Sequence, residues 1–266
     1  MSLGSFTPPA PPPPPGGHAL LAGKVVVVTA AAGTGIGSAT ARRCVEEGAT
    51  VVVSDAHERR LAEAAEELSA LSGSPVLAVP CDVTREEDVQ HLYRSVVERH
   101  GHLDVAVHNA GLGGTVPLVD MTDEQWTRVL DVTLTGTFRC TRAALGHLLA
   151  QRSGAIVNNA SVLGWRAQPG QAHYAAAKAG VMALTRCAAA EAAEAGVRVN
   201  AVSPSLAEHP FLNRAIPDED LAVLRDRELF RRGAETWEVA NVIVFLASDY
   251  SSYMSGEIVS VSSQHA

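Results

Sequence analysis

Residues 24–37 read KVVVVTAAAGTGIG, an apolar run followed by a glycine-rich turn and the start of a helical pattern. Consecutive valines favour a strand that is buried on both faces, because β-branched side chains fit a pleated sheet. Glycines directly after such a strand let the backbone approach a ligand closely. A helix that begins there directs its first amides at a bound anion. The stretch therefore predicts a strand–turn–helix unit of a parallel α/β sheet.

The same alternation continues along the chain, where short valine-rich runs separate longer segments of helical period. The predicted strands are Val25–Thr29, Thr50–Ser54, Val76–Pro80, Val105–His108, Ile156–Asn159, Val197–Val202 and Ile258–Val261. We therefore expect an α/β fold with a doubly wound, parallel seven-stranded sheet in a single domain.

Helix starts and buried stripes support this order of elements. Thr84 with Glu87, and Thr122 with Gln125, match the capping box, in which side chains at both ends bind unpaired amides. Two apolar stripes at helical spacing are expected to face the core: Val89, Leu92 and Val96, and Ile36, Thr40, Ala41, Cys44 and Val45.

Composition narrows the class of function. The chain has 266 residues, 47% of them hydrophobic, and a formal net charge of -8 with no dense run of Lys or Arg. Nucleic acids and anionic membranes bind clustered cations, so a small-molecule substrate is the better expectation. Cysteines and histidines show no metal-ligand spacing, and no metal is predicted. The four cysteines are Cys44, Cys81, Cys140 and Cys187, which we expect to be buried thiols in a reducing compartment.

Two segments depart from the α/β pattern. Residues 1–18 are rich in proline and are expected to form a disordered, solvated tail before a domain spanning residues 19–266. The tail does not resemble a signal peptide, and the chain lacks a long apolar run, so we expect a cytoplasmic protein. The excursion from Ser205 to Arg232 is either a lid over a site or a pair of solvated surface helices.

Ligands of open parallel sheets bind beyond the carboxyl ends of the strands. The residues expected there are Gly33, Thr34, Gly35 and Ile36 after the first strand, Asp55 after the second, Asp82 and Val83 after the third, Asn109, Ala110 and Gly111 after the fourth, and Ser161 after the fifth. Asp55 can bind the ribose hydroxyls of an adenine dinucleotide and would repel a 2′-phosphate, which favours NAD over NADP. Arg59 and Arg60 keep NADP possible. The alternative is that Asp55 only ends a strand.

Tyr174 and Lys178 lie four residues apart in a helix-forming run, which places both on one helical face. A nearby cation favours the phenolate form of a tyrosine, so we expect the pKa of Tyr174 to be lowered. Ser161 precedes Tyr174 by 13 residues and can bind the same substrate oxygen.

The glycine turn, Asn109-Ala110-Gly111, Ser161 and Tyr174-xxx-Lys178 stand in the order and spacing of the short-chain dehydrogenases/reductases, which the chain resembles from about Leu20 onward. The resemblance implies a Rossmann-type sheet, a homotetramer, and hydride transfer between NAD(P) and a secondary alcohol or ketone. It implies that Tyr174 exchanges the proton, that Ser161 holds the carbonyl oxygen and that Lys178 contacts the nicotinamide ribose. Asp82 and Val83 would meet the adenine, and Asn109 to Gly111 would line the adenosine side.

Some positions depart from the family pattern. The turn lacks its first glycine, Thr133 replaces a common asparagine of the catalytic set, Ser205 follows Pro204, and His209 stands where a threonine often contacts the cofactor. These departures leave open an alternative in which the chain is a catalytically idle dinucleotide-binding sensor or scaffold.

Three runs, Thr29 to Gly37, Asn158 to Gln168 and Ser203 to Ser205, resemble a narrower group within the family. It comprises 3-oxoacyl-thioester reductases and dehydrogenases of a hydroxy-indane CoA ester in steroid-ring degradation. The residues that this resemblance places near the substrate are Trp165, Arg166, Gln168 and His173. Four arginines either meet a CoA phosphate or form an ordinary charged helix face: Arg225, Arg227, Arg231 and Arg232.

Overall fold

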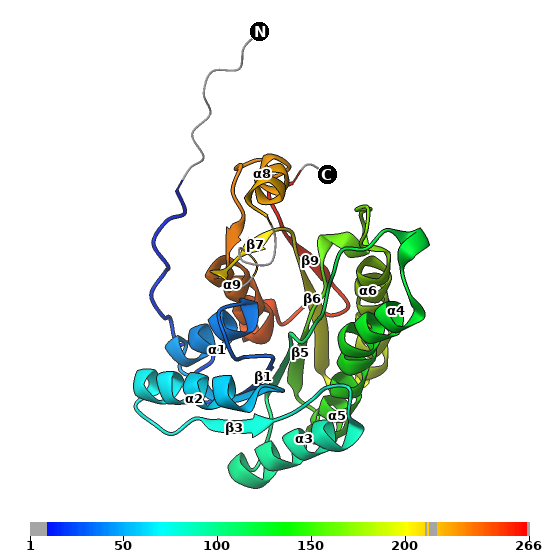
Figure 1. Ribbon diagram of the computed structural model, residues 1–266. Coiled ribbons are helices and arrows are strands. Elements are labelled where there is room, and N and C mark those ends of the chain that lie inside the picture. The colour runs from blue at the N-terminus through cyan, green and yellow to red at the C-terminus, as the bar shows by residue number, and fades with distance from the viewer. Residues whose placement is uncertain (1–9, 211, 213–216, 265–266) are drawn as a thin grey trace.

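The computed structural model describes residues 10–210, 212 and 217–264. A parallel sheet forms its centre, with the strand order β3-β2-β1-β4-β5-β6-β9 (Figure 1). The strands are β1 (Val25–Thr29), β2 (Thr50–Asp55), β3 (Leu77–Pro80), β4 (Val105–His108), β5 (Gly154–Asn159), β6 (Val197–Pro204) and β9 (Ile258–Val261). The order runs outward in both directions from β1 and β4, which confirms the predicted doubly wound, seven-stranded sheet.

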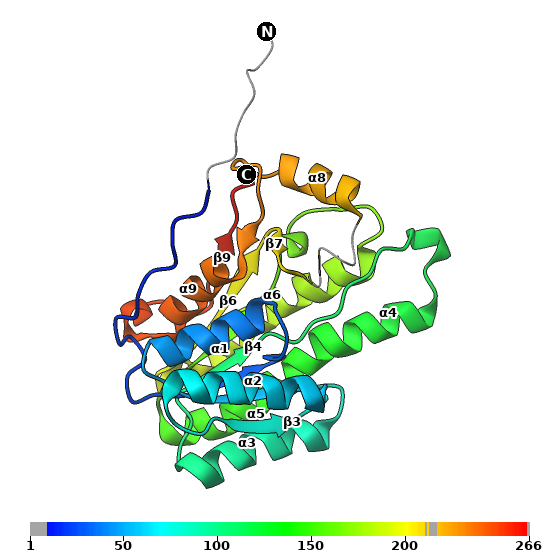
Figure 2. The same ribbon diagram turned by 60° about the vertical axis from the view of Figure 1, so that its left-hand side comes forward.

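Eight α-helices are described: α1 (Ile36–Glu46), α2 (Glu58–Ser72), α3 (Glu86–His100), α4 (Asp123–Leu130), α5 (Gly136–Gln151), α6 (Ala172–Ala192), α8 (Asp218–Asp226) and α9 (Thr236–Ala247). Helices α1, α2 and α9 cover one face of the sheet, and α3, α5 and α6 cover the other (Figures 1 and 2). Short helical turns occupy Leu118–Asp120, Val162–Gly164, Ala193–Ala195 and Asp249–Ser251, and Asp131–Thr135 is π-helical.

Alternation along β1 explains why its valine run is uninterrupted. Val26 and Val28 pack into the core beneath α1, α2 and α9, whereas Val25 and Val27 pack into the core beneath α3, α5 and α6. Successive side chains of a strand point to opposite faces, and both faces are covered here. Both predicted helical stripes face these cores, although Ile36 is only partly buried.

Two small strands, β7 (Ala207–Glu208) and β8 (Ala234–Glu235), pair with each other in parallel and were not predicted. They lie at the two ends of the 205–232 excursion, and α8, which comes between them along the chain, lies near the top of the view in Figure 2. Two residues per strand leave no periodic sequence signal. Residues 211 and 213–216 of the excursion lie outside the described residues.

Of the two predicted capping boxes, the one at α4 is confirmed. Thr122 Oγ1 accepts from the Gln125 amide at 3.2 Å, and Gln125 Oε1 accepts from the Thr122 amide at 2.9 Å. The box between Thr84 and Glu87 is wrong, because α3 begins one residue later with Arg85 as its N-cap. The Thr84 hydroxyl donates instead to Asp82 Oδ1 at 2.8 Å.

The cysteine prediction is correct at three positions and wrong at one. Cys44, Cys81 and Cys140 are buried free thiols, whereas Cys187 is exposed on α6. The run around Cys187 is so rich in alanine that its sequence gives little amphipathic contrast. Among the described residues, no helix is both long and apolar enough to cross a membrane.

The end of the proline-rich segment contacts the domain before the predicted boundary at residue 19. Arg43 donates to the carbonyl oxygens of Pro15 and Gly16 at 3.0 and 3.1 Å. The buried Glu47 carboxylate accepts from the amides of His18 and Leu20 at 2.8 and 3.0 Å. The rest of the predicted tail is largely exposed from residue 10, and residues 1–9 lie outside the described residues.

Candidate active site

The direction of the chain crossovers reverses between β1 and β4, and the turns that follow these two strands flank the point where open α/β sheets bind ligands. After β1, Ala30 adopts a left-handed φ of 49° and Gly33 a φ of 96°. A Cβ added at Gly33 would meet nothing within 4 Å, so this side of the turn is open. The predicted residues Thr34, Gly35 and Ile36 follow at the start of α1.

The start of α1 fits a phosphate group. Its N-cap is Gly35, and no side chain caps the first amides of the helix. Such amides and the helix dipole together favour an anion. Gly37 is required for a different reason, because a Cβ there would lie 2.1 Å from the Ala30 carbonyl oxygen and 2.5 Å from Asn109 Nδ2. The turn is therefore held tightly against β4.

Asp55 ends β2, and its carboxylate faces the glycine turn. It accepts from the Ala32 amide at 3.3 Å and from the His57 amide at 2.9 Å. A cavity of about 220 Å³ lies between the glycine turn, α1 and α2. The residues that line this cavity are Gly33, Thr34, Ser38, Arg42, Arg60, Glu63, Ala64, Glu67 and Leu68. The predicted carboxylate and one of the two compensating arginines thus come to the same corner of the sheet.

The turn after β3 contributes Asp82 and Val83. Asp82 Oδ1 accepts from both the amide and the hydroxyl of Thr84, so this carboxylate shapes the turn before α3. Val83 is buried and lies against α5, where a Cβ added at Gly136 would come within 2.6 Å of its side chain. Both residues stand at the predicted strand end.

Asn109 joins the glycine turn to the neighbouring strands. Its backbone amide donates to Thr29 Oγ1 at 3.0 Å, and its side-chain Nδ2 donates to the Ala30 carbonyl oxygen at 3.2 Å. Its Oδ1 accepts from Asn159 Nδ2 at 2.8 Å. One side chain therefore fixes the relative positions of β1, β4 and β5 at their carboxyl ends.

Ser161, Tyr174 and Lys178 come together at the end of β5 and the start of α6, as predicted. Lys178 Nζ lies 5.5 Å from the centre of the Tyr174 ring, and the Ser161 hydroxyl is close enough to lower the pKa of Tyr174. Lys178 is 3% exposed and donates to the Asn159 carbonyl oxygen at 2.5 Å. A Cβ added at Gly111 would lie 3.4 Å from Lys178 Nζ and 3.8 Å from Thr133 Oγ1, so the turn after β4 also reaches this group.

The expected direction of the Tyr174 shift is wrong in this structure. Burial of the hydroxyl raises the pKa of Tyr174, and the hydrogen bond with Ser161 offsets this only in part. The same burial lowers the pKa of Lys178 to about 8. Removing water disfavours both charged forms, and this effect exceeds the attraction between them.

Thr133 lies in the π-helical segment before α5, a type of irregularity that is frequent at functional sites. Its hydroxyl accepts from the Leu112 amide at 2.9 Å and donates to the Leu112 carbonyl oxygen at 3.1 Å. Thr133 therefore fixes the loop after Gly111, which passes beside Tyr174: a Cβ at Gly113 would lie 3.6 Å from that ring.

A cluster of buried polar side chains lies in the core beneath α3, α5 and α6. Two of its members, His108 and Asn158, directly precede Asn109 and Asn159 in the sequence. Tyr93 OH contacts His108 Nε2 at 2.7 Å, and His108 Nδ1 contacts Asn158 Oδ1 at 2.8 Å. Asn158 Nδ2 donates to Thr185 Oγ1 at 2.9 Å. Burial lowers the pKa of His108 to about 4, so the ring is neutral. It then donates to Asn158 from Nδ1 and accepts the Tyr93 proton at Nε2.

The residues that the resemblance places near the substrate lie around the start of α6. Trp165 is half exposed, and Gln168 is partly buried. Arg166 donates to Gln264 near the end of the chain. His173 is buried, with its Nδ1 accepting from the Tyr174 amide at 2.8 Å. Their positions flank the Tyr174 region and leave contact with substrate a prediction.

His209 approaches the glycine turn from the excursion. A Cβ added at Gly35 would lie 3.9 Å from His209 Nε2, while His209 Nδ1 accepts from the Leu212 amide at 3.4 Å. His209 therefore lies near the glycine turn, as expected for a residue at the cofactor-contacting position.

Two of the four arginines of the excursion, Arg225 and Arg232, already bind carboxylates within the protein. Arg225 makes two hydrogen bonds to Glu208, and Arg232 makes two to Glu238. Arg231 lies 3.9 Å from Asp226. Arg227 is exposed. Carboxylates that already bind a guanidinium in bidentate fashion reduce its attraction for a phosphate.

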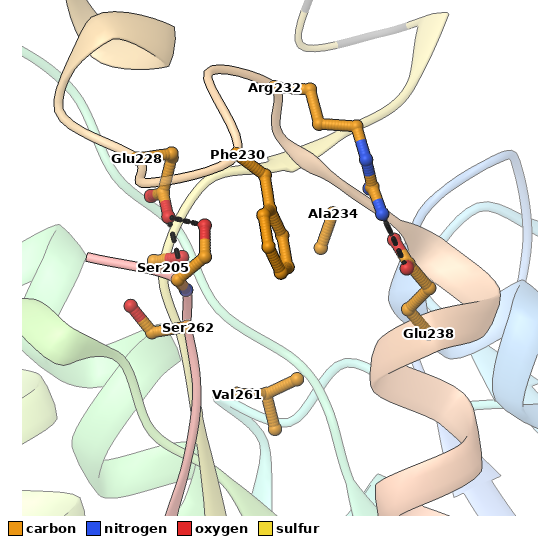
Figure 3. A pocket seen from close by; sticks show the side chains of 9 residues that line it. Ser205, Glu228, Phe230, Arg232, Ala234, Glu238, Val261 and Ser262 are labelled. Atoms are coloured by element: carbon orange, nitrogen blue, oxygen red, sulfur yellow. Dashed lines mark hydrogen bonds and ion pairs between the residues drawn. The ribbon is translucent and has the colours of Figure 1, made fainter. Parts of the chain in front are cut away.

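A separate cavity of about 170 Å³ lies beyond the ends of β6 and β9. Figure 3 shows Phe230 inside it, with Glu228 and Ser205 on one side and the pair of Arg232 and Glu238 on the other. Glu228 is 3% exposed and accepts from the amide and hydroxyl of Ser263.

The motif search missed three residues that shape the site. Thr29 accepts the Asn109 amide, Ala30 takes the left-handed conformation in place of the absent glycine, and Asn159 binds both Asn109 and Lys178. Each is polar or small and stands at a strand end. Thr29 and Asn159 are the last residues of β1 and β5, so their polar side chains at strand ends are the sequence signal for them.

Known proteins are similar to this chain over nearly all of the residues that form the site. A family model described as Enoyl-(Acyl carrier protein) reductase matches residues 30–263. The (5R,7aS)-5-hydroxy-7a-methyl-1-oxo-2,3,5,6,7,7a-hexahydro-1H-indene-carboxyl-CoA reductase of Mycobacterium tuberculosis is 64% identical over 235 residues, covering 88% of this chain and 90% of that protein. The 3-oxoacyl-[acyl-carrier-protein] reductase of Thermotoga maritima is 39% identical over 230 residues, covering 86% of this chain and 93% of that protein. A crystal structure of a short chain dehydrogenase from Mycobacterium smegmatis gives a TM-score of 0.85 at 60% identity, covering 96% of this chain and 98% of that one.

Proposed function

The chain belongs to the short-chain dehydrogenase/reductase family, and from this premise we propose that it reduces a ketone on a thioester-linked substrate with a nicotinamide cofactor. The observation that carries the proposal is the meeting of Ser161, Tyr174 and Lys178 at one end of the sheet. This intact set gives no support to the alternative of an idle sensor or scaffold.

The nicotinamide supplies the hydride when it is bound. The Ser161 hydroxyl lies close enough to Tyr174 to act on its pKa, so the two hydroxyls can hold the same carbonyl oxygen of the substrate. As the carbonyl carbon gains the hydride, Tyr174 gives its proton to the oxygen and a secondary alcohol forms. Burial raises the pKa of Tyr174, so its hydroxyl carries the proton at neutral pH before substrate binds.

Lys178 is placed to hold the cofactor on the reacting side of the site. A lysine ammonium has three donors, and the Asn159 carbonyl oxygen takes one of them. The remaining donors can bind a ribose hydroxyl beside Tyr174. The glycine turn and the uncapped start of α1 would receive the pyrophosphate at the other end of the cofactor.

The substrate class rests on the named relatives. One acts on a carboxyl-CoA ester of a hydroxy-oxo-indene ring system, and the other on a 3-oxoacyl group carried by a protein. Both substrates join an oxo group to a large thioester carrier. We therefore expect kcat/KM to be at least tenfold higher for a ring ketone as its CoA ester than for the matched free acid. Equal values would refute the thioester preference.

NAD(H) is the proposed cofactor. The Asp55 carboxylate faces the turn where the adenosine ribose would lie, and a 2′-phosphate there would meet a like charge. Arg42 and Arg60 line the adjacent cavity together with Glu63 and Glu67, which offset their charge. NADH should bind more tightly than NADPH in parallel titrations, and equal dissociation constants would overturn this choice.

Replacing Tyr174 with Phe tests the mechanism. This change should lower kcat by about 100- to 10,000-fold, the usual contribution of a general acid, and should leave the dissociation constant of NADH nearly unchanged. Tyr253→Phe is the matched control, because Tyr253 is fully exposed. A Tyr174→Phe enzyme with wild-type turnover would exclude the proposed proton transfer.

We further propose that the enzyme is a cytoplasmic homotetramer. Its four unpaired cysteines suit a reducing compartment, and the family supplies the expectation of four subunits. Sedimentation analysis of the full chain tests the assembly, since a monomer at micromolar concentration would contradict it.

A further inference from the structure

Asn159 is the last residue of β5 and stands between the two ends of the proposed cofactor site. On one side its Nδ2 donates to Asn109, which in turn holds the glycine turn through the Ala30 carbonyl oxygen. On the other side its own carbonyl oxygen accepts from Lys178 Nζ. Ser161 follows two residues later. A dinucleotide that reaches from the glycine turn to Tyr174 must pass this position.

The side-chain oxygen of Asn159 has no hydrogen-bond partner among the described residues, although the side chain is only 8% exposed. The orientation of the amide is fixed by its neighbours. Asn109 must direct Nδ2 toward the Ala30 carbonyl oxygen, which turns its Oδ1 toward Asn159. Asn159 must then present Nδ2 as the donor, because a flipped amide would set two oxygens against each other.

A buried acceptor without a donor destabilises the folded protein, so a partner from a ligand is the natural explanation. The part of a nicotinamide dinucleotide between its pyrophosphate and its reacting carbon carries ribose hydroxyls and a carboxamide NH₂, which are all donors. We propose that Asn159 Oδ1 accepts a hydrogen bond from this nicotinamide-ribose part of the bound cofactor. The assignment rests on the proposed function and adds to it a residue that recognises the reactive half of the cofactor.

The test compares Asn159→Leu with the wild type in direct binding experiments with NADH and with ADP, which lacks the nicotinamide riboside. Leucine has nearly the size of asparagine and offers no acceptor. NADH should bind about tenfold more weakly to the variant, a change of ~1.4 kcal/mol, and ADP should bind equally to both. The ligand-free variant loses both the unpartnered oxygen and the Nδ2 hydrogen bond to Asn109, and because these two effects oppose each other its melting temperature should change little.

Asn241→Leu is the matched control. Asn241 lies on α9 and also has a buried side-chain oxygen without a partner among the described residues, but it is not at a strand end. Its replacement should leave NADH affinity unchanged. Asn159→Val serves as a second variant if the leucine disturbs the strand, since β-branched side chains suit this position.

The outcomes separate the two proposals. Tight binding of NADH by the wild type, with unchanged affinity in both Asn159 variants, overturns the assignment of Asn159 and leaves the proposed function intact. An equal loss of NADH and ADP affinity also overturns it, because the effect would then lie in the shape of the site. A wild-type protein that binds neither NADH nor NADPH would overturn the proposed function itself.

Discussion

Lys178→Met should make the ligand-free protein more stable near neutral pH while abolishing its activity. The Lys178 side chain is 3% exposed, and burial lowers its pKa from the ordinary 10.5 to about 8. The difference, 10.5 − 8, is about 2.5 pH units, and each unit corresponds to ~1.36 kcal/mol. Keeping the ammonium charged in the folded state therefore costs about 3 kcal/mol. Methionine has a similar length and carries no charge.

The lost hydrogen bond opposes this gain. Without Lys178 the Asn159 carbonyl oxygen loses its partner at 2.5 Å, which costs about 1–2 kcal/mol. The net gain expected at pH 7 is therefore about 1–2 kcal/mol. A residue that lowers stability in this way is typical of an active site, where function limits how far stability can be improved.

The pH dependence gives the decisive measurement. The folded pKa lies below the unfolded one, so between about pH 8 and 10.5 the unfolded chain binds more protons and wild-type stability rises with pH. Near pH 9 this contribution reaches about 1.4 kcal/mol, and the advantage of the variant shrinks by that amount.

Urea unfolding at pH 7 and pH 9 measures the difference between the two proteins. Lys24→Met is the control, because Lys24 forms a surface ion pair with Asp249 at 3.0 Å and should contribute less than 1 kcal/mol. A methionine variant that is less stable at pH 7, or a difference that does not change with pH, would refute the reasoning.

Two further predictions concern buried polar groups away from the reacting atoms. Glu47→Ala should lower the free energy of unfolding by about 3–5 kcal/mol in urea, because the buried Arg43 keeps only Glu46 as a charged partner and the amides of His18 and Leu20 lose their acceptor. Burial alone would raise the pKa of Glu47, but hydrogen bonds from backbone amides outweigh it and lower the pKa, so wild-type stability should fall as the pH drops through the acidic range and the variant should lose this dependence. His108→Leu should cost about 3 kcal/mol by stranding Tyr93 and Asn158, and adding Tyr93→Phe should cost less than the sum of the two single changes. Additive losses would show that the two side chains are not coupled.

The sheet could be predicted from sequence because its strands are buried on both faces. Such strands carry unbroken apolar runs, and the strongest of them, β1 and β4, have the bounds that were expected. The residues at strand ends were also predictable, since topology alone brings the carboxyl ends of parallel strands to one edge. Gly33, Asp55, Asn109 and Ser161 were found in this way.

Features decided by competition between groups could not be predicted in the same way. The sequence around Thr84 contains a capping motif, but Asp82 takes the Thr84 hydroxyl and α3 starts one residue later. The pKa of Tyr174 depends chiefly on burial, and only the fold determines how much water remains around the hydroxyl. A sequence pattern predicts which groups are neighbours, but packing decides which of their interactions is stronger.

The pairing of β4 with β5 links the fold to the proposed chemistry. His108 lies opposite Asn158, and this pair points toward α3 and α6. The next residues, Asn109 and Asn159, point to the other side, where they bind each other and Asn109 contacts the glycine turn. A slip of one residue would exchange these two faces, so that each polar side chain would lose its partners. The hydrogen bonds of His108 with Asn158 therefore fix the same register that places the Asn159 carbonyl oxygen against Lys178. Stability of the core and alignment of the cofactor turn with the catalytic lysine are consequences of one strand register.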